Sequence, residues 1–156
     1  MSHEEAPINN QENRVWELRD AITFKLKTKG ANPTARLQRM GFEMVRVASN
    51  EFSGGSSSLI LHVNGEWSKK SGMGGYSIRN ATIPELLEEY AAIEDSTFSD
   101  LQLRGVGDRS RKSLSDDERD EYYRKKKEEE KKYIEDNKPR LLQGFIESLE
   151  RTLQEF

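Results

Sequence analysis

An Asn64-Gly65 pair between two strand-like segments restricts the fold of this chain more than any other feature of the sequence. Both residues tolerate the positive φ angles of a type I′ turn, which joins two adjacent antiparallel strands. Before the pair, Leu59 and Leu61 recur at every second position, the period of a half-buried strand. The pattern predicts a β-hairpin over residues 57–70 and therefore an antiparallel sheet.

Two further segments with the strand period, at residues 42–47 and 76–78, extend this sheet. Thr82 and Glu85 then have the spacing of a capping box, which predicts the start of a helix. That helix has its apolar residues on one face: Leu86, Leu87, Tyr90 and Ile93. A one-sided apolar helix covers a small sheet, so we expect an α+β fold in which helices cover a small antiparallel sheet.

Two predictions compete for the first basic segment, because its apolar residues fit both periods. Val15, Leu18, Ile22 and Leu26 have helical spacing, whereas Ile22, Phe24 and Leu26 alternate as in a strand. We favour a short helix over 12–20 followed by a strand over 22–28, since β-branched and aromatic residues gather in the second part. Asn32 and Pro33 then predict a short helix that runs through Met40 and ends at Gly41.

The C-terminal part has a different character. Ser115 and Glu118 form a second capping-box pattern, and the mostly charged run 116–136 has acid-first i, i+4 pairs that support a helix. Asn137 and Pro139 end it. A coiled-coil-like apolar stripe follows at steps of four, three, four and three: Leu142, Ile146, Leu149, Leu153 and Phe156.

The stripe must pack on another apolar surface. Three surfaces are open: a second copy of the chain, a groove on a partner protein, or the chain's own domain. Folding back onto its own domain is slightly favoured over the other two together, because the rest of the chain is short of core residues. We thus divide the chain into a disordered acidic tail (1–13), a basic α+β domain (14–100), a Gly/Ser/Arg linker (101–115) and a charged helical extension that ends in an amphipathic helix (116–156).

The near-neutral net charge of −3 is a cancellation between two segments. Residues 14–79 carry eleven Lys/Arg against five Asp/Glu, and residues 80–156 carry fourteen against twenty. Such asymmetry is typical of a polyanion-binding surface followed by an acidic appendage. Attraction between the two halves within one fold accounts for it equally well.

Several classes of function are disfavoured. With no cysteine, the chain has no disulfide and no thiolate metal site, and its polar N-terminus is unlike a signal peptide. We therefore expect a cytoplasmic protein without a membrane span. His3 lies in the tail and His62 in the hairpin, neither at metal-ligand spacing, and the glycine-rich stretch 72–75 lacks the Lys-Ser/Thr of a phosphate-binding loop. We expect no enzyme, no metal and no cofactor.

The favoured hypothesis is binding of single-stranded nucleic acid, RNA in preference to DNA, by the basic α+β half. Such sites combine cations that follow the phosphates with aromatic rings that stack on bases. The candidate residues are Lys25, Lys27, Lys29, Arg36, Arg39, Arg46, Trp67, Lys69, Lys70, Tyr76 and Arg79. Packing of Trp67 and Tyr76 on the sheet is the competing structural explanation.

The alternative hypothesis is a small adaptor or inhibitor that binds a protein partner through its C-terminal helices. The amphipathic stripe that ends at Phe156 would then make the contact, with a partner or with a second copy of the chain. A homodimer is compatible with either hypothesis.

Overall fold

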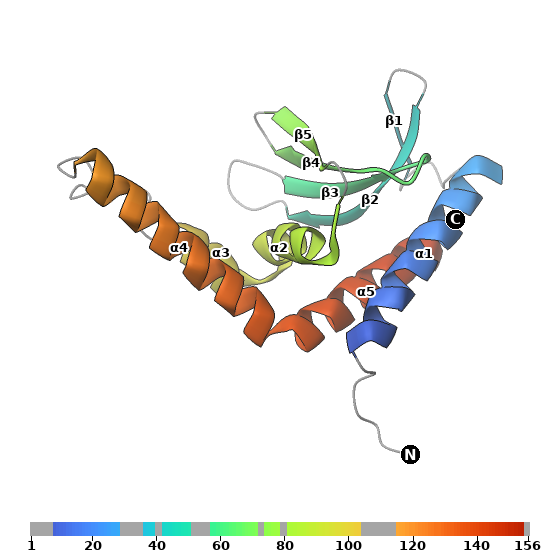
Figure 1. The fold of residues 1–156 in the computed structure, drawn as a ribbon. Coiled ribbons are helices and arrows are strands. Elements are labelled where there is room, and N and C mark those ends of the chain that lie inside the picture. The colour runs from blue at the N-terminus through green and yellow to red at the C-terminus, as the bar shows by residue number, and fades with distance from the viewer. Residues whose placement is uncertain are drawn as a thin grey trace, which may run out of the picture.

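The structure is a computed structural model of residues 1–156, and it describes residues 8–28, 36–39, 42–50, 57–71, 74–78, 81–103 and 115–154. Within these ranges the chain forms an antiparallel sheet and a layer of helices (Figure 1). The predicted α+β class and the C-terminal helical part are confirmed.

The sheet has five strands in the order β1-β2-β3-β4-β5, so each strand pairs with its neighbour in sequence. Every pairing is antiparallel. The strands are β1 (Arg36–Arg39), β2 (Phe42–Asn50), β3 (Ser57–His62), β4 (Trp67–Ser71) and β5 (Gly74–Ile78). The sheet is a meander with no crossover, which agrees with the strands predicted around residues 42–47, 57–70 and 76–78.

The predicted hairpin is confirmed, but its turn is not of type I′. The Gly65 amide donates to the His62 carbonyl (2.9 Å) and the His62 amide donates to the Glu66 carbonyl (2.8 Å). Three residues therefore form the loop, and Gly65 takes its positive φ of 89° as the last of them. This is the longer type of hairpin connection, in which only the glycine position requires a positive φ.

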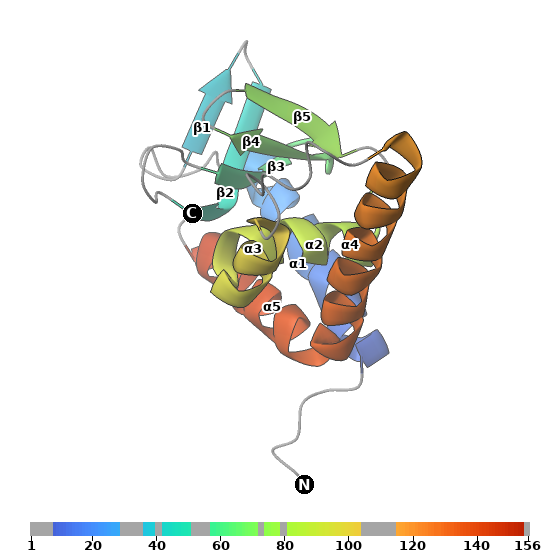
Figure 2. The same ribbon diagram turned by 90° about the vertical axis from the view of Figure 1, so that its left-hand side faces the viewer.

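The helices are α1 (Ile8–Thr28), α2 (Ile83–Glu94), α3 (Ser96–Leu103), α4 (Asp116–Asp136) and α5 (Lys138–Gln154). All of them lie on one side of the sheet (Figures 1 and 2). Helices α1, α2 and α5 contact the sheet, and α1 and α5 pack against each other. Helix α4 leaves the body of the molecule at an angle, with its N-terminal half farthest from α1 and α5 (Figure 1).

The strand predicted over 22–28 is wrong, because these residues continue helix α1 without a break. Val15, Leu18, Ile22 and Leu26 are at most 1% exposed, whereas Phe24 is 65% exposed. The helical period therefore describes the buried face, and the alternation of Ile22, Phe24 and Leu26 has no structural meaning. The helix also begins at Ile8, within the stretch predicted to be a disordered tail.

The helix predicted to run from Asn32 and Pro33 through Met40 is also wrong where the structure describes it. Arg36–Arg39 form β1, paired with β2 from Arg36 opposite Val45 to Arg39 opposite Phe42. Pairing with the neighbouring strand outweighs the weak local preference for a helix.

The two predicted capping boxes stand at helix starts. The Thr82 hydroxyl accepts from the Glu85 amide at the start of α2. Ser115 and Glu118 cap α4 reciprocally, and Asn137 ends α4 before α5 begins at Lys138. Helix α3 was not predicted, and it extends to Leu103, inside the stretch assigned to a linker. The rest of that linker up to residue 114 lies outside the described residues.

Helix α5 folds back into the main core. Leu142 and Leu149 are completely buried, Ile146 is nearly so, and Leu153 packs on the same core at its edge. The core joins α5 to α1, to α2 and to the strands through Val45, Leu59, Leu61 and Trp67. The fold-back that was slightly favoured from the sequence is the arrangement observed.

Candidate nucleic-acid interface

The face of the sheet that the described helices leave uncovered is the first candidate site, and we call it the open face. Successive side chains of a strand point to opposite faces. Since Val45, Leu61, Trp67 and Ile78 face the core, their neighbours along each strand point the other way. The described residues of the open face are Met44, Arg46, Ser49, Ser58, Ile60, His62, Ser68, Lys70, Gly75 and Ser77.

The strand register places one row of the open face across four strands. Arg46 of β2 lies opposite Ile60 of β3, Ile60 opposite Ser68 of β4, and Ser68 opposite Ser77 of β5. A neighbouring row brings in Lys70, which lies opposite Ser58 and Gly75. Arg46 and Lys70 are exposed, and because two strand spacings and one row separate them, their backbones lie about 12 Å apart.

The open face carries no carboxylate among its described residues, and neither Arg46 nor Lys70 forms an ion pair with a described residue. Ile60 and Ser58 on this face are each only 4% exposed. A ligand on this face can therefore reach the charged groups of Arg46 and Lys70. It can also reach the half-buried hydroxyl of Ser68 and the exposed hydroxyl of Ser77.

His62 and Ser68 form the polar pair of the open face, with Nε2 of His62 2.8 Å from Oγ of Ser68. Burial lowers the pKa of His62. The nearby carboxylate of Glu66 acts to raise this pKa, but its effect is smaller. His62 is therefore neutral at neutral pH and acts as a hydrogen-bonding ring, not as a third cation.

Three of the candidate residues do not belong to the open face. Trp67 is 2% exposed, and its ring packs against Phe145 with the centroids 5.9 Å apart. It cannot stack on a base at the surface, and the competing structural explanation holds for this residue. Lys69 points to the helix side, where its Nζ is 3.1 Å from Oε2 of Glu89 on α2. Lys25 is half-buried on α1.

Lys27 is a fourth candidate outside the open face, exposed in the last turn of α1. The remaining candidates are placed only in part. Arg36 and Arg39 belong to β1 and Tyr76 to β5, and only their backbone positions are described. Lys29, Arg79 and Phe156 lie outside the described residues. Of the predicted cations, the structure brings Arg46 and Lys70 together on one face.

The apolar stripe of α5 is not available to a partner. Leu142, Ile146 and Leu149 are buried against α1, α2 and the sheet, so exposing them would require opening the core. In the folded chain these three residues fill the interior. The predicted role of the stripe in self-association or partner binding stays a prediction.

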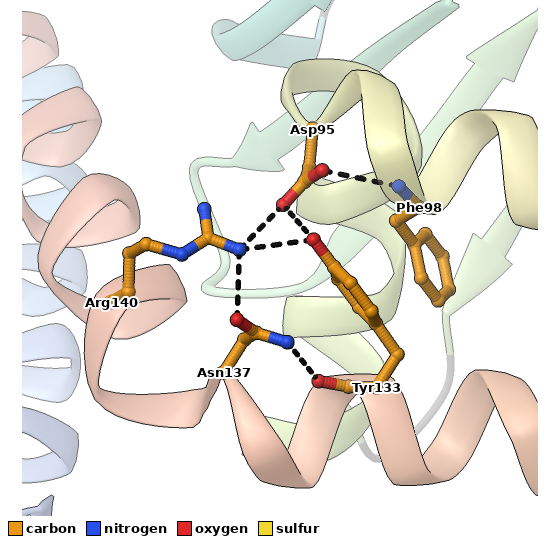
Figure 3. A network of polar contacts seen from close by, with 5 residues as sticks. All are labelled: Asp95, Phe98, Tyr133, Asn137 and Arg140. Atoms are coloured by element: carbon orange, nitrogen blue, oxygen red, sulfur yellow. Dashed lines mark hydrogen bonds and ion pairs between the residues drawn. The ribbon is translucent and has the colours of Figure 1, made fainter.

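A second polar cluster, centred on Asp95, joins four helices (Figure 3). Asp95 lies between α2 and α3, and its Oδ1 accepts from the Phe98 amide (3.1 Å). Its Oδ2 accepts from Tyr133 Oη (2.8 Å) at the end of α4 and from Arg140 (2.9 Å) at the start of α5. Arg140 also donates to Tyr133 and to Asn137, whose Nδ2 donates to the Tyr133 carbonyl.

Electrostatics indicate a structural role for the Asp95 cluster. Burial acts to raise the pKa of Asp95, but the hydrogen bonds from Phe98, Tyr133 and Arg140 outweigh it and lower that pKa. Burial and the same carboxylate raise the pKa of Tyr133. Asp95 thus remains ionised, and both of its carboxylate oxygens accept hydrogen bonds. It therefore links the helices and is a poor general base.

Sequence reasoning missed His62, Ser68 and Ser77 as members of one face, although the strand alternation contained the signal. Each of the two serines neighbours a core residue in sequence, Trp67 and Ile78 respectively, and must point away from the core. It also missed Asp95, whose position three residues before Phe98 is that of a helix N-cap.

The part of the chain that the structure describes contains no helix with the length and apolar character of a membrane span. Nor do its described residues include three grouped His, Asp or Glu side chains suited to a metal ion. The fold and the open face define a protein of the α+β class with a five-stranded meander that helices cover on one side. Comparisons with protein-family models, with curated proteins and with solved structures found no match for the chain.

Proposed function

We propose that this chain is a non-enzymatic, cytoplasmic nucleic-acid-binding protein that holds single-stranded nucleic acid on the open face of its sheet. The observation that carries the proposal is the composition of that face. It presents Arg46 and Lys70 together with serine hydroxyls, and none of its described residues is a carboxylate.

These groups suit a nucleic-acid backbone. Arginine, lysine and serine side chains supply many of the contacts to phosphate oxygens and sugars. Serine hydroxyls both donate and accept hydrogen bonds, so Ser68 and Ser77 can pair with the 2′-hydroxyl that distinguishes RNA from DNA. RNA is therefore the favoured ligand, bound through backbone contacts without stacking on Trp67.

Direct titration of labelled strands tests the proposal. A mixed-sequence RNA of about 15 nucleotides, followed by fluorescence anisotropy, should bind at low salt and weaken steeply as salt rises. The double variant Arg46→Ala/Lys70→Ala should bind at least about tenfold more weakly, and its salt slope should be smaller by about 0.7 for each phosphate that it no longer neutralises. A DNA strand of the same sequence should bind more weakly.

The matched control is Lys132→Ala, which removes an exposed cation from α4, away from the sheet. It should leave RNA affinity unchanged within about twofold, because a distant exposed charge contributes little at moderate salt. Absence of RNA binding at low salt, or an equal loss in Lys132→Ala and in the double variant, would contradict the proposal.

A further inference from the structure

Strand β5 forms one edge of the described sheet, and β1 forms the other. The helices contact the sheet mainly through β2 and β3, and β5 lies farther from α2 than β3 does in both views (Figures 1 and 2). Gly75 and Ser77 of β5 are exposed. An edge strand presents backbone N–H and C=O groups that its own sheet does not use, so it can pair with another strand.

The hydrogen bonds of β4 decide which way the backbone groups of β5 point. In an antiparallel ladder, hydrogen-bonded residue pairs alternate with pairs that are not hydrogen-bonded. At the turn between β3 and β4, the His62 amide donates to the Glu66 carbonyl. The next hydrogen-bonded pairs along this ladder are therefore those of Ser68 and Lys70, whose backbone groups face β3. The backbone groups of Lys69, which lies between them, face β5.

The outward groups of β5 follow from this alternation. Lys69 lies opposite Tyr76, so the backbone groups of Tyr76 face β4. Gly75 and Ser77, on either side of Tyr76, direct their N–H and C=O groups to the outer edge. None of these groups bonds to another backbone group in the part of the chain that the structure describes. Each of the two residues therefore offers one donor and one acceptor at the edge.

The two edges of the sheet differ in charge. Strand β1 begins with Arg36 and ends with Arg39. Charged residues on an edge strand oppose its pairing with another chain. Strand β5 has the sequence GGYSI, without a charged residue or a proline. Of the two edges, β5 is therefore the one suited to pairing.

A second copy of β5 complements this edge. When two β5 strands lie antiparallel with Tyr76 of each at a two-fold axis, Gly75 of one copy lies opposite Ser77 of the other. Both reciprocal pairs are then hydrogen-bonded pairs, so the donors and acceptors of Gly75 and Ser77 are all used. We propose that the chain forms a symmetric dimer through β5, with one continuous sheet across the two copies.

Electrostatics permit this dimer. The paired strands carry no charge, and Lys69 in the next strand already pairs with Glu89. The two copies of Lys70 would be separated by three strand spacings and one row, which places their backbones about 16 Å apart. This exceeds the Debye length of about 8 Å at physiological salt, so repulsion between them is largely screened.

The same pairing joins the open faces of the two copies. The row from Arg46 to Ser77 of one copy continues into Gly75 and Lys70 of the other. Five strand spacings, about 24 Å, separate Arg46 from that lysine. A nucleic-acid strand could then follow one row across both copies. This consequence rests on the proposed function, whereas the dimer itself does not.

The absence of cysteine from the chain makes the register of the dimer testable. Tyr76 would lie opposite its own counterpart in a pair that is not hydrogen-bonded, with Cα atoms about 4.5 Å apart, within the range of a disulfide. Tyr76→Cys should therefore form a disulfide-linked dimer under mild oxidation, detected by non-reducing electrophoresis. Ser77→Cys is the matched control, because its two Cα atoms would be about 8 Å apart, too far for a disulfide.

Sedimentation velocity of the unmodified chain tests the dimer directly. A short edge gives a small interface and hence a weak dimer, so the average mass should rise from one chain toward two between about 10 and 500 μM. Ser77→Pro removes an outward N–H without taking a bond from β4, which is the kind of edge position where proline is tolerated. This variant should stay monomeric over the same range with an unchanged circular dichroism spectrum, whereas Lys132→Ala should dimerise like wild type.

The outcomes separate this inference from the proposed function. A wild-type chain that stays monomeric would overturn the dimer and leave the edge to an extended segment of another protein. Disulfide formation by Tyr76→Cys no faster than by Ser77→Cys would also overturn it, and this comparison decides the question even if Ser77→Pro does not fold. A monomer that binds RNA through Arg46 and Lys70 leaves the proposed function standing. A β5 dimer that binds no RNA supports this inference and overturns strand binding.

Discussion

The hydroxyl of Ser148 in α5 donates a 2.6 Å hydrogen bond to the backbone carbonyl of Val47 in β2. The register between β2 and β3 shifts between Arg46 and Ala48, so Val47 has no cross-strand partner there. The C-terminal helix therefore bonds to the sheet at a β-bulge. The bond ties α5 to a specific place on the sheet, in addition to the non-directional packing of its leucines.

Ser148→Ala should reduce the free energy of unfolding by about 0.5–1.5 kcal/mol, because it removes a buried hydrogen bond between α5 and β2. Gln143→Ala, at an exposed position of the same helix, should change it by less than about 0.5 kcal/mol. Urea unfolding followed by circular dichroism measures both. Equal stability of the two variants would mean that the bond contributes nothing.

Phe145→Ala should cost about 3–5 kcal/mol of unfolding free energy. This completely buried ring contacts Trp67 and Tyr90, at centroid distances of 5.9 and 5.3 Å, so its removal leaves a cavity at the centre of the core. Phe24→Ala is the matched control, because Phe24 is 65% exposed on α1. Its expected effect is within about 0.5 kcal/mol. A Phe145→Ala protein as stable as Phe24→Ala would contradict the position of α5 in the core.

Gly144→Ala should destabilise the protein even though alanine is the better helix residue by about 1 kcal/mol. A Cβ at this position would lie 2.5 Å from the Tyr90 hydroxyl, closer than atoms pack. In a Tyr90→Phe background the same substitution should be neutral or stabilising, because the next nearest ring atom is at 3.4 Å. Thermal unfolding of the two single variants and the double variant gives the coupling energy. Additive effects would show that the two residues do not clash.

Asp95→Asn should cost about 1–3 kcal/mol at neutral pH, because the amide accepts less strongly from Tyr133 and Arg140. The folded-state pKa of Asp95 is lowered, so its contribution is complete above the unfolded-state value of about 3.9 and is lost as pH falls through the folded value. The stability gap between wild type and variant should therefore narrow in acid. Asp100→Asn, at an exposed position of α3, should change the free energy of unfolding at neutral pH by less than about 0.5 kcal/mol.

Local patterns predicted the elements whose ends are set by neighbouring residues. The helix starts at Thr82 and Ser115 and the hairpin around Gly65 are of this kind. The prediction of a strand over 22–28 failed because the apolar residues there fit both the helical and the strand period. The segment is helical in the structure, where α1 packs against α5. The β1 strand was missed because its pairing with β2 outweighs its local preference.

The candidate site was harder to predict than the elements. Strand alternation places Trp67 on the same side of the sheet as Leu61, its cross-strand partner, and this pattern alone is sufficient to assign the indole to the core. The contact between Asp95 and Arg140 is different, since 45 residues separate the two. Only the folded arrangement of α2 and α5 brings them together.

Helices α1 and α5 pack against each other, and polar contacts such as Gln11 with the Pro139 carbonyl and Glu12 with Lys138 reinforce this packing. During synthesis, the part of α1 that packs on α5 therefore has no partner until residues 138–154 have left the ribosome. Its long-range contacts predict slow folding, with α1 exposed to chaperones in the meantime. A truncation before α5 would leave the same face of α1 uncovered, so such fragments should aggregate instead of folding as a smaller domain.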